Sequence, residues 1–246
     1  MMKYSQTGIN LNRDTKEPDK ETPIQRITTI KDWPKYQPHS TTNAADVVCI
    51  GISTGGPAAL MKMLPLIPED FPLPILIVQH IPLDFIDDFI RGLSSCSSLP
   101  VKVAEDGARI TKGAILVAPG DRHLTVVRDG LFKVVKLVDT PAVGGHRPSV
   151  DVMFSSIAKA YHGRAIAVLM TGMGKDGAKE MGHLYNLGAI TVAQDEKTSV
   201  VYGMPRAAIE AGYVHFVVSL DRMAKTLISL AEKYSDYNRS VAEKKS

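Results

Sequence analysis

The sequence predicts an α/β fold, a doubly wound and mostly parallel sheet flanked by helices, with one inserted antiparallel β-hairpin. Short apolar runs alternate along the chain with segments of helical length, as in sheets wound from β-α-β units. Several of these runs are continuously apolar, which is typical of strands covered on both faces. One stretch, "HLTVVRDGLFKVVKL", instead carries two strand-like arms around Arg128-Asp129-Gly130, and Asp-Gly between alternating arms is a strong hairpin signal.

Each expected element follows from its local pattern, taken in chain order. The first strand is an apolar run around Cys49, and the first helix begins at Pro57, which suits a first-turn position. Later strands include the apolar runs "PILIVQ", "AILVAP", "AIAVLM" and "AITVAQ". We expect strands at 46–51, 74–79, 101–104, 114–119, 165–170, 189–194 and 214–218. We expect helices at 57–65, 83–93, 150–162, 175–187, 204–211 and 220–235.

Three segments of different composition divide the chain. Residues 1–45 mix both charges with Pro, Thr and Ser without sustained periodicity, and we expect a disordered N-terminal tail or linker. Residues 46–235 carry all the expected strands and helices and form one folded domain, and residues 236–246 are expected to be a C-terminal tail. Trp33, the only tryptophan, lies in the N-terminal tail as an incidental residue or as a docking anchor.

The composition is that of an ordinary globular protein, and it favours neither a nucleic-acid-binding protein nor a membrane protein. The chain is 44% apolar and 22% charged, with a net charge of +3 and no basic run interleaved with aromatics, so nucleic acid is not indicated as a partner. Only two cysteines occur, which favours a reducing compartment. No signal-peptide core is present and no apolar run approaches the roughly 20 residues that span a bilayer, so we expect a cytoplasmic protein without membrane insertion.

The stretch "CIGISTGGPAAL" places Ser53 at a sharp turn between the first strand and the first helix. Gly51, Gly55 and Gly56 permit such a turn and a close approach of the backbone. The free N–H groups of the new helix suit either a bound phosphate or a nucleophilic hydroxyl beside an oxyanion. No Gly-Lys-Ser/Thr follows, which excludes a P-loop, and the dinucleotide fingerprint lacks its acidic residue after the second strand.

Three residues that carry chemistry are expected at one edge of the sheet. Ser53 follows the first strand, His80 directly follows "ILIVQ", and Asp176 lies in "TGMGKDG" after "AIAVLM". The carboxyl ends of parallel strands meet at one edge, where doubly wound sheets bind their ligands. A serine nucleophile needs a base and the base needs an orienting group, so these three residue types match a catalytic triad.

Each of these residues also has a structural interpretation that stays open on the residues alone. Ser53 could be a turn or helix-cap residue, His80 a loop histidine, and Asp176 the cap of the helix that begins near it. His146, in "GGHRPS", follows a Gly-rich loop and is a rival base. No pair of histidines has metal-ligand spacing with a nearby Cys or carboxylate, so we expect no metal site.

Five motifs, in order, resemble the catalytic domain of the bacterial chemotaxis methylesterases, the protein-glutamate methylesterases. They are "VVCIGISTGGPAAL", "PILIVQHIP", "APGDRHL", "HRPSVDVMFSSIA" and "AVLMTGMGKDGAKEM", and together they span most of the folded part. The resemblance implies a carboxylic ester hydrolase that removes methyl groups from glutamyl methyl esters of chemoreceptors, with release of methanol, in chemosensory adaptation. The same chemistry would deamidate receptor glutamines, since an amide passes through a similar tetrahedral intermediate. Neither reaction requires a metal or organic cofactor.

The resemblance also assigns the site residues. The triad falls on Ser53, His80 and Asp176, which selects the histidine after the second strand over its rival. Thr54, beside the serine, and Met173, in "TGMG", are implicated at the oxyanion or substrate site. The partner would be a methylated chemoreceptor. The alternative function is a non-catalytic or nucleotide-binding regulatory module of the same fold.

Many members of this family carry an N-terminal receiver domain whose phosphorylation relieves inhibition of the esterase. The 45 residues before the expected domain are too few for such a core, so we expect a stand-alone esterase or one that is regulated in another way. Arg91 and Arg147 could approach an acidic receptor surface or could be solvated. The sequence does not indicate an oligomeric state.

Overall fold

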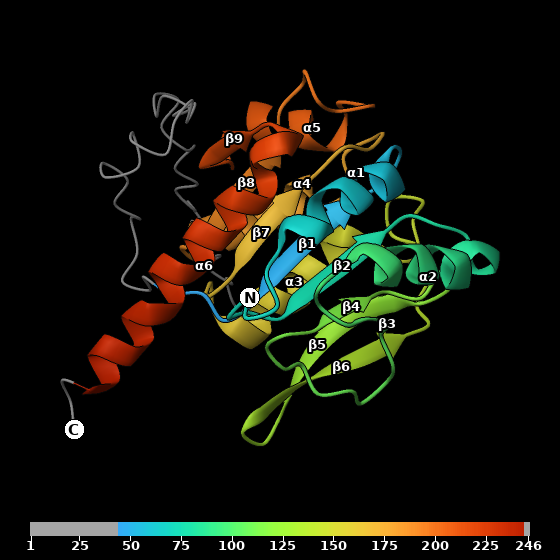
Figure 1. Cartoon of the computed structure of the whole chain (residues 1–246). Coiled ribbons are helices and arrows are strands. Elements are labelled where there is room, and N and C mark those ends of the chain that lie inside the picture. Colours follow the sequence, from blue (N-terminus) through green and yellow to red (C-terminus); the bar gives the residue numbers. More distant parts are fainter. Residues whose placement is uncertain (1–43, 244–246) are drawn as a thin grey trace, which may run out of the picture.

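A seven-stranded parallel sheet forms the centre of the molecule, in a computed structural model that describes residues 44–243 (Figure 1). The strand order is β3-β4-β2-β1-β7-β8-β9. The strands are β1 (Val48–Ile52), β2 (Ile75–Gln79), β3 (Val101–Val103), β4 (Ile115–Val117), β7 (Ile166–Leu169), β8 (Ile190–Gln194) and β9 (Phe216–Val218). A separate antiparallel hairpin consists of β5 (His123–Asp129) and β6 (Phe132–Val138).

Within the described residues, six α-helices lie on the two faces of the sheet. They are α1 (Gly56–Met63), α2 (Ile86–Cys96), α3 (Val150–Tyr161), α4 (Ala178–Asn186), α5 (Met204–Glu210) and α6 (Leu220–Glu243). A short 3-10 turn, η2 (Leu64–Leu66), follows α1, and a second one, η3 (Leu83–Phe85), directly precedes α2. Within residues 44–243, none of the helices is both long enough and apolar enough to cross a membrane.

The predicted fold class is confirmed, with every expected strand and helix present and their ends shifted by a few residues. The hairpin turn lies one residue later than expected, because Asp129 pairs with Phe132 and leaves Gly130 and Leu131 as the turn residues. Gly130 has a φ of +57°, which glycine adopts without strain. At the C-terminal end, α6 continues past residue 235, where the sequence analysis placed the start of a tail.

The described part begins two residues before the expected domain boundary. Ala44 and Ala45 are already buried, so packing includes the end of the segment that was expected to be a tail. Trp33 and the rest of residues 1–43 lie outside the described residues. Cys49 and Cys96 are free thiols.

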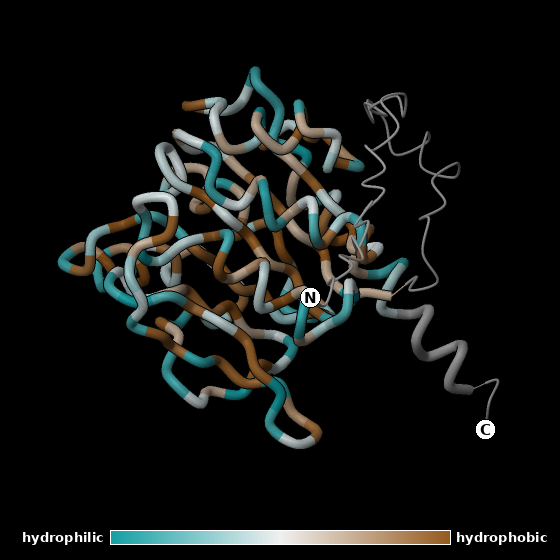
Figure 2. The backbone as a smooth tube through the Cα atoms, turned by 180° about the vertical axis from the view of Figure 1, so that it is seen from behind, coloured by the Kyte–Doolittle hydropathy of each residue, from teal (hydrophilic) through white to brown (hydrophobic). Residues whose placement is uncertain are grey.

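Alternate residues of each central strand enter two separate hydrophobic cores. In β1, Val48 and Ile50 face the core that contains α1, α2 and α6, whereas Cys49 faces the core that contains α3, α4 and α5. In β2, likewise, Ile75 faces the first of these cores and Leu76 faces the second, because successive side chains of a strand point to opposite faces of the sheet. Figure 2 shows the hydrophobic stretches running through the middle of the fold, with hydrophilic segments on the outside. Burial on both faces explains why the strand sequences are continuously apolar.

Strand β1 lies at the switch point of the sheet. From β1 the chain adds β2, β3 and β4 on one side and then returns to add β7, β8 and β9 on the other side. The loops after β1 and β7 therefore diverge to opposite faces, and they leave a crevice at the carboxyl ends of these strands. Doubly wound sheets bind ligands in such a crevice.

Two glycines let the start of α3 approach this crevice. A Cβ on Gly51 of β1 would lie 2.3 Å from Cγ1 of Val150, and a Cβ on Gly177 would lie 2.5 Å from the same atom. Gly177 also has a φ of +88°, a conformation that other residues rarely adopt. The first residue of α3 thus packs directly against the backbone of β1 and of the loop after β7.

Replacing Gly51 by alanine tests this close approach. The added methyl group has no room beside Val150, and we expect the free energy of unfolding to fall by about 1–3 kcal/mol. The matched control is Gly92→Ala in α2, where the nearest atom is the flexible end of Met61 and where alanine gains up to about 1 kcal/mol of helix propensity. Urea unfolding of both variants measures the difference. Equal effects at the two positions would contradict the packing argument.

Candidate active site

The three residues expected at the sheet edge follow three neighbouring strands. Ser53 follows β1, His80 follows β2, and Asp176 lies in the loop between β7 and α4. The register of β1 and β2 pairs Ile52 with Gln79, and the N–H of His80 donates to the carbonyl of Ile52 at 3.1 Å. Ser53 and His80 therefore begin adjacent loops on the same edge.

The carboxylate of Asp176 is the centre of a buried hydrogen-bond network. Oδ2 accepts from Nε2 of His80 at 2.8 Å and from the N–H of Val150 at 2.7 Å. Oδ1 accepts from Oγ of Ser149 at 2.8 Å and from the N–H of Asp151 at 3.0 Å. Asp176 is only 6% exposed, so these four donors replace the water that the carboxylate loses on folding.

This environment keeps Asp176 ionised. Burial alone would raise the pKa of Asp176, but the hydrogen bonds from His80, Asp151, Val150 and Ser149 outweigh burial and hold the pKa below its ordinary value. Two of the donors are the first N–H groups of α3, where the helix dipole favours a negative charge. The alternative interpretation of Asp176 as a cap for the helix after it is wrong, because α4 has Gly177 at its N-cap and no side-chain cap.

The hydrogen bond to Asp176 fixes the protonation of His80. An ionised carboxylate only accepts, so Nε2 of His80 carries the proton in the neutral ring. Nδ1 is then a free lone pair. It is buried and has no hydrogen-bond partner within the described part of the chain. A buried unpartnered nitrogen on a histidine beside an aspartate is available to take a proton from a third group.

The backbone at Ser53 is held from both neighbouring strands. Its N–H donates to the carbonyl of Thr171 at 3.0 Å, and its carbonyl accepts from Nε2 of Gln79 at 3.0 Å. The hydroxyl of Thr171 donates to the carbonyl of Thr54 at 2.9 Å. Gly56 allows this packing, because a Cβ there would lie 1.9 Å from Oε1 of Gln79. Among the described residues, no hydrogen bond involves the hydroxyl of Ser53 itself, which leaves it free to face a ligand.

Two backbone N–H groups beside Ser53 are unused. Those of Thr54 and Met173 make no hydrogen bond within residues 44–243, whereas that of Ser53 is engaged. Met173 follows Gly172, and a Cβ on Gly172 would lie 2.8 Å from Cβ of Ser53. The loop that carries Met173 therefore passes directly beside the serine. Met173 is 71% exposed, so this side of the site is open to a large ligand.

The rival histidine, His146, lies on the face of His80 rather than in its place. The two rings are stacked, with centroids 3.9 Å apart and an angle of 7° between their planes. Burial lowers the pKa of His146 and the neighbouring His80 lowers it further, while Asp176 acts in the opposite direction. The structure thus places His146 in the site, with no hydrogen bond to Asp176.

The two arginines considered for receptor contact are paired with nearby carboxylates. Nη1 of Arg147 donates to Asp139 at 2.6 Å, and Arg91 forms a hydrogen bond to Asp88 one turn earlier in α2. Both pairs are exposed on the surface. Exposed pairs of this kind contribute little to stability.

Sequence reasoning missed three residues that support the site. Gln79 and Thr171 hold the backbone of Ser53 and Thr54, and Ser149 donates to Asp176 while it caps α3. The sequence contains a pattern that could have identified two of them. Ser149 is a serine directly before a helix, a common N-cap, and Gln79 is a polar residue that ends an otherwise apolar strand.

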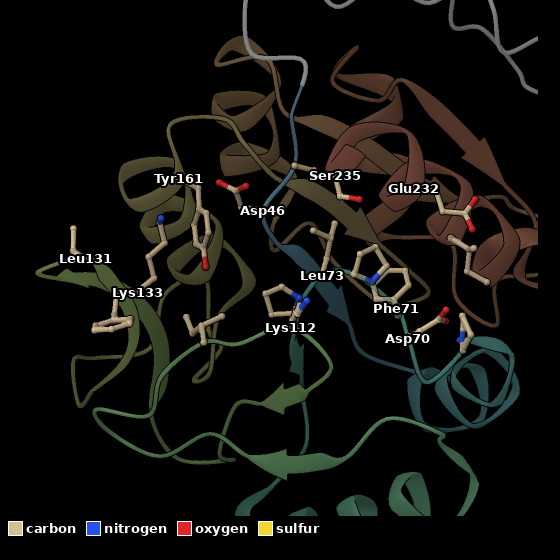
Figure 3. Close-up of a pocket in the computed structure, with 17 residues that line it drawn as sticks. Asp46, Asp70, Phe71, Leu73, Lys112, Leu131, Lys133, Tyr161, Glu232 and Ser235 are labelled. Atoms are coloured by element: carbon tan, nitrogen blue, oxygen red, sulfur yellow. The ribbon is translucent and has the colours of Figure 1, made fainter. Parts of the chain in front are cut away.

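A separate cavity of about 600 Å³ opens at the opposite edge of the sheet (Figure 3). It is lined by residues that precede strands, such as Asp46 before β1 and Lys112 before β4. Ser53 and His80 follow strands and lie at the other edge. This cavity is therefore distinct from the candidate active site. No cluster of His, Cys, Asp and Glu that could hold a metal ion occurs among the residues that the structure describes.

Comparisons with known proteins identify one family. A family model described as CheB methylesterase matches residues 48–227. The protein-glutamate methylesterase/protein-glutamine glutaminase of Treponema denticola is 46% identical over 201 residues, which cover 82% of this chain and 54% of that protein. The Treponema pallidum protein of the same name is 45% identical and covers 77% of this chain and 47% of its own length. The chain spans about half the length of the curated relatives it matches.

A solved structure is also similar. The crystal structure of the Thermotoga maritima CheB methylesterase catalytic domain matches with a TM-score of 0.74 and 38% sequence identity. The match covers 76% of this chain and 99% of that domain. About three quarters of this chain thus corresponds to nearly the whole of that domain.

Changing Asp176 to asparagine tests the network. The lowered pKa means that the carboxylate stabilises the fold above the pKa of the unfolded chain, and that this contribution is lost as the pH falls through the lower pKa of the folded state. We expect Asp176→Asn to lose about 1–3 kcal/mol of unfolding free energy at neutral pH, because an amide NH₂ would face an N–H donor.

The loss should shrink when urea unfolding is repeated below the ordinary aspartate pKa of about 4, because the carboxylate of the unfolded wild-type chain then takes up a proton and favours unfolding. Asp139→Asn is the matched control, since Asp139 is an exposed carboxylate paired only at the surface. We expect it to change stability by less than about 0.5 kcal/mol at either pH. A pH-independent loss for Asp176→Asn would contradict an ionised Asp176.

Proposed function

The chain belongs to the CheB methylesterase family, and from this premise we propose that it is a serine esterase that hydrolyses glutamyl methyl esters of bacterial chemoreceptors. The observation that carries the proposal is the buried pair of Asp176 and His80, which leaves Nδ1 of His80 without a partner on the loop adjacent to that of Ser53. The names of the curated relatives support the substrate class.

The first half of the proposed reaction uses the three residues together. Oγ of Ser53 attacks the ester carbonyl while Nδ1 of His80 takes the hydroxyl proton. Asp176 holds the ring through Nε2 and stabilises the imidazolium that forms. Nδ1 then gives its proton to the leaving oxygen, methanol departs, and an acyl-enzyme on Ser53 remains.

The negative charge of the tetrahedral intermediate needs donors that are free before the reaction. We assign this role to the N–H groups of Thr54 and Met173, because both lie beside Ser53 and neither is used elsewhere in residues 44–243. Such preorganised donors lower the barrier most, since they need not reorient as charge develops. In the second half, a water activated by His80 attacks the acyl-enzyme and releases a glutamate side chain.

The same site would deamidate a glutamine. An amide forms a similar tetrahedral intermediate and releases ammonia in place of methanol. The curated relatives are named for both activities, which favours this second reaction. Neither reaction, as proposed, passes through a metal or an organic cofactor.

The substrate is a side chain of another protein, so the site must admit a folded surface. The exposure of Met173 and Thr54 at the rim agrees with this requirement. We also propose that the chain acts in the cytoplasm, since its two cysteines favour a reducing compartment.

Methanol release from methylated receptor is the test of this function. We expect the wild-type chain to release methanol, and Ser53→Ala and His80→Ala to lose a factor of about 10⁴ or more in kcat, because each removes a step of proton transfer or attack. Asp176→Asn should lose about 10⁴-fold, since the amide favours the wrong tautomer of His80.

Ser95→Ala is the control, since Ser95 is exposed on α2 and bonds only within that helix. It should keep the wild-type rate. Wild-type release that survives Ser53→Ala would overturn the serine mechanism. A wild type that releases nothing, and whose melting temperature rises with ATP, GTP or NAD, would favour the nucleotide-binding alternative.

A further inference from the structure

The stacked ring of His146 has no part in the triad, yet it touches the proposed base. Its centroid lies 3.9 Å from that of His80, with the rings nearly parallel. His146 is half-buried, whereas Val143 and Arg147 on the same loop are exposed. The side chain therefore lies between His80 and the solvent on one face of the ring.

The hydrogen bond to Asp176 does not by itself fix the orientation of His80. It anchors Nε2 at 2.8 Å, but the ring can still rotate about the axis of that bond. Such a rotation moves Nδ1, the atom that must meet the hydroxyl of Ser53. A flat ring packed against the face of His80 removes this freedom, because rotation would separate the two faces. Aromatic pairs in close contact resist such separation.

The loop that carries His146 is built to hold it in place. Val143 and His146 exchange two backbone hydrogen bonds of 3.0 Å, around a turn in which Gly144 and Gly145 have φ angles of +60° and +85°. This is a tight two-residue turn that glycines adopt without strain.

The base of the same loop is closed by a buried histidine. The ring of His123 is fully buried, and its Nδ1 accepts from the N–H of Ser149 at 3.1 Å. Nε2 therefore carries the proton and donates to the carbonyl of Pro141 at 3.2 Å. His123 thus ties together the two ends of the loop, and Ser149 continues from it to Asp176. One connected network of hydrogen bonds therefore positions both the loop of His146 and Asp176, the carboxylate that binds the ring edge of His80.

We propose that His146 is a positioning residue, whose ring holds His80 in the orientation that directs Nδ1 at Ser53. The inference rests on the proposed esterase function and adds a residue to it. His146 acts through the face of its ring and takes no proton in the reaction. The lowered pKa of His146 is consistent with this role, because a neutral ring does not repel the cation that forms on His80.

Two substitutions separate stacking from imidazole chemistry. His146→Ala removes the ring, and we expect kcat for methanol release to fall about tenfold to a hundredfold, with KM changed less than about threefold. His146→Phe restores a flat ring, and it should recover most of the wild-type kcat. Thr140→Ala is the control on the same loop, since the side chain of Thr140 is exposed and makes no hydrogen bond within residues 44–243, and it should leave kcat unchanged.

Labelling of the serine by a fluorophosphonate gives a readout that needs no receptor. The rate of labelling should fall in His146→Ala and recover in His146→Phe, and the melting temperature of each variant reports whether the fold is intact. An unchanged kcat and labelling rate in His146→Ala would overturn the inference. So would a His146→Phe variant as slow as His146→Ala, or an effect on KM alone.

The labelling assay also separates this inference from the proposed substrate. If the wild type releases no methanol but the labelling rates follow the expected order, His146 keeps its role and the receptor ester is the wrong substrate. If the wild type releases methanol and the variants all match it, only the inference fails. A wild type that neither releases methanol nor reacts with the fluorophosphonate would contradict both the proposed esterase function and the role of His146.

Discussion

The carboxylate of Asp176 is the interaction on which the site depends. Four donors from two segments converge on it: the ring of His80 after β2, and the hydroxyl of Ser149 with the first two N–H groups of α3. A buried charge with fewer partners would be costly, so the start of α3 must stay close to the loop after β7. Gly51 and Gly177 make that approach sterically possible. The same contact that satisfies a helix terminus therefore orients the proposed base.

A second set of contacts holds the serine, whereas the contacts of Asp176 hold the histidine. Gln79 and Thr171 hold the backbone around Ser53 from the two strands that flank β1, so the serine is fixed by main-chain contacts and its hydroxyl stays free. The switch point of the sheet explains why this is possible, since loops from β2, β1 and β7 meet there. The base is fixed at its edge by Asp176 and on its face by His146. The opposite edge of the sheet holds a separate cavity with none of these residues.

The sequence predicted the sheet, its helices and the edge at which the site residues gather, because these follow from local apolar patterns and from the geometry of parallel strands. It predicted His80 as a partner of Asp176, but not the donors at the start of α3. Val150 and Ser149 are 26 and 27 positions away, and only packing of α3 against β1 brings them together. Local reasoning left a second interpretation open, in which Asp176 caps the helix that follows it. The choice between His80 and His146 was open on the residues for a similar reason, since both lie at the site and stacking between loops leaves no pattern in the sequence. The hairpin turn lies later than the sequence predicted because Asp129 pairs with Phe132. The alternating pattern of the two arms does not show by itself which residues pair across the hairpin.

The most direct test of this account is the tautomer of His80 in solution. Nitrogen-15 NMR of the chain with labelled histidine, assigned with a His80→Gln variant and recorded where the ring is neutral, distinguishes a protonated ring nitrogen from an unprotonated one. The account predicts a proton on Nε2 and a free Nδ1 in the wild type, and loss of this preference in Asp176→Asn. A proton on Nδ1 in the wild type would contradict it, because Nδ1 could then not accept the proton of Ser53.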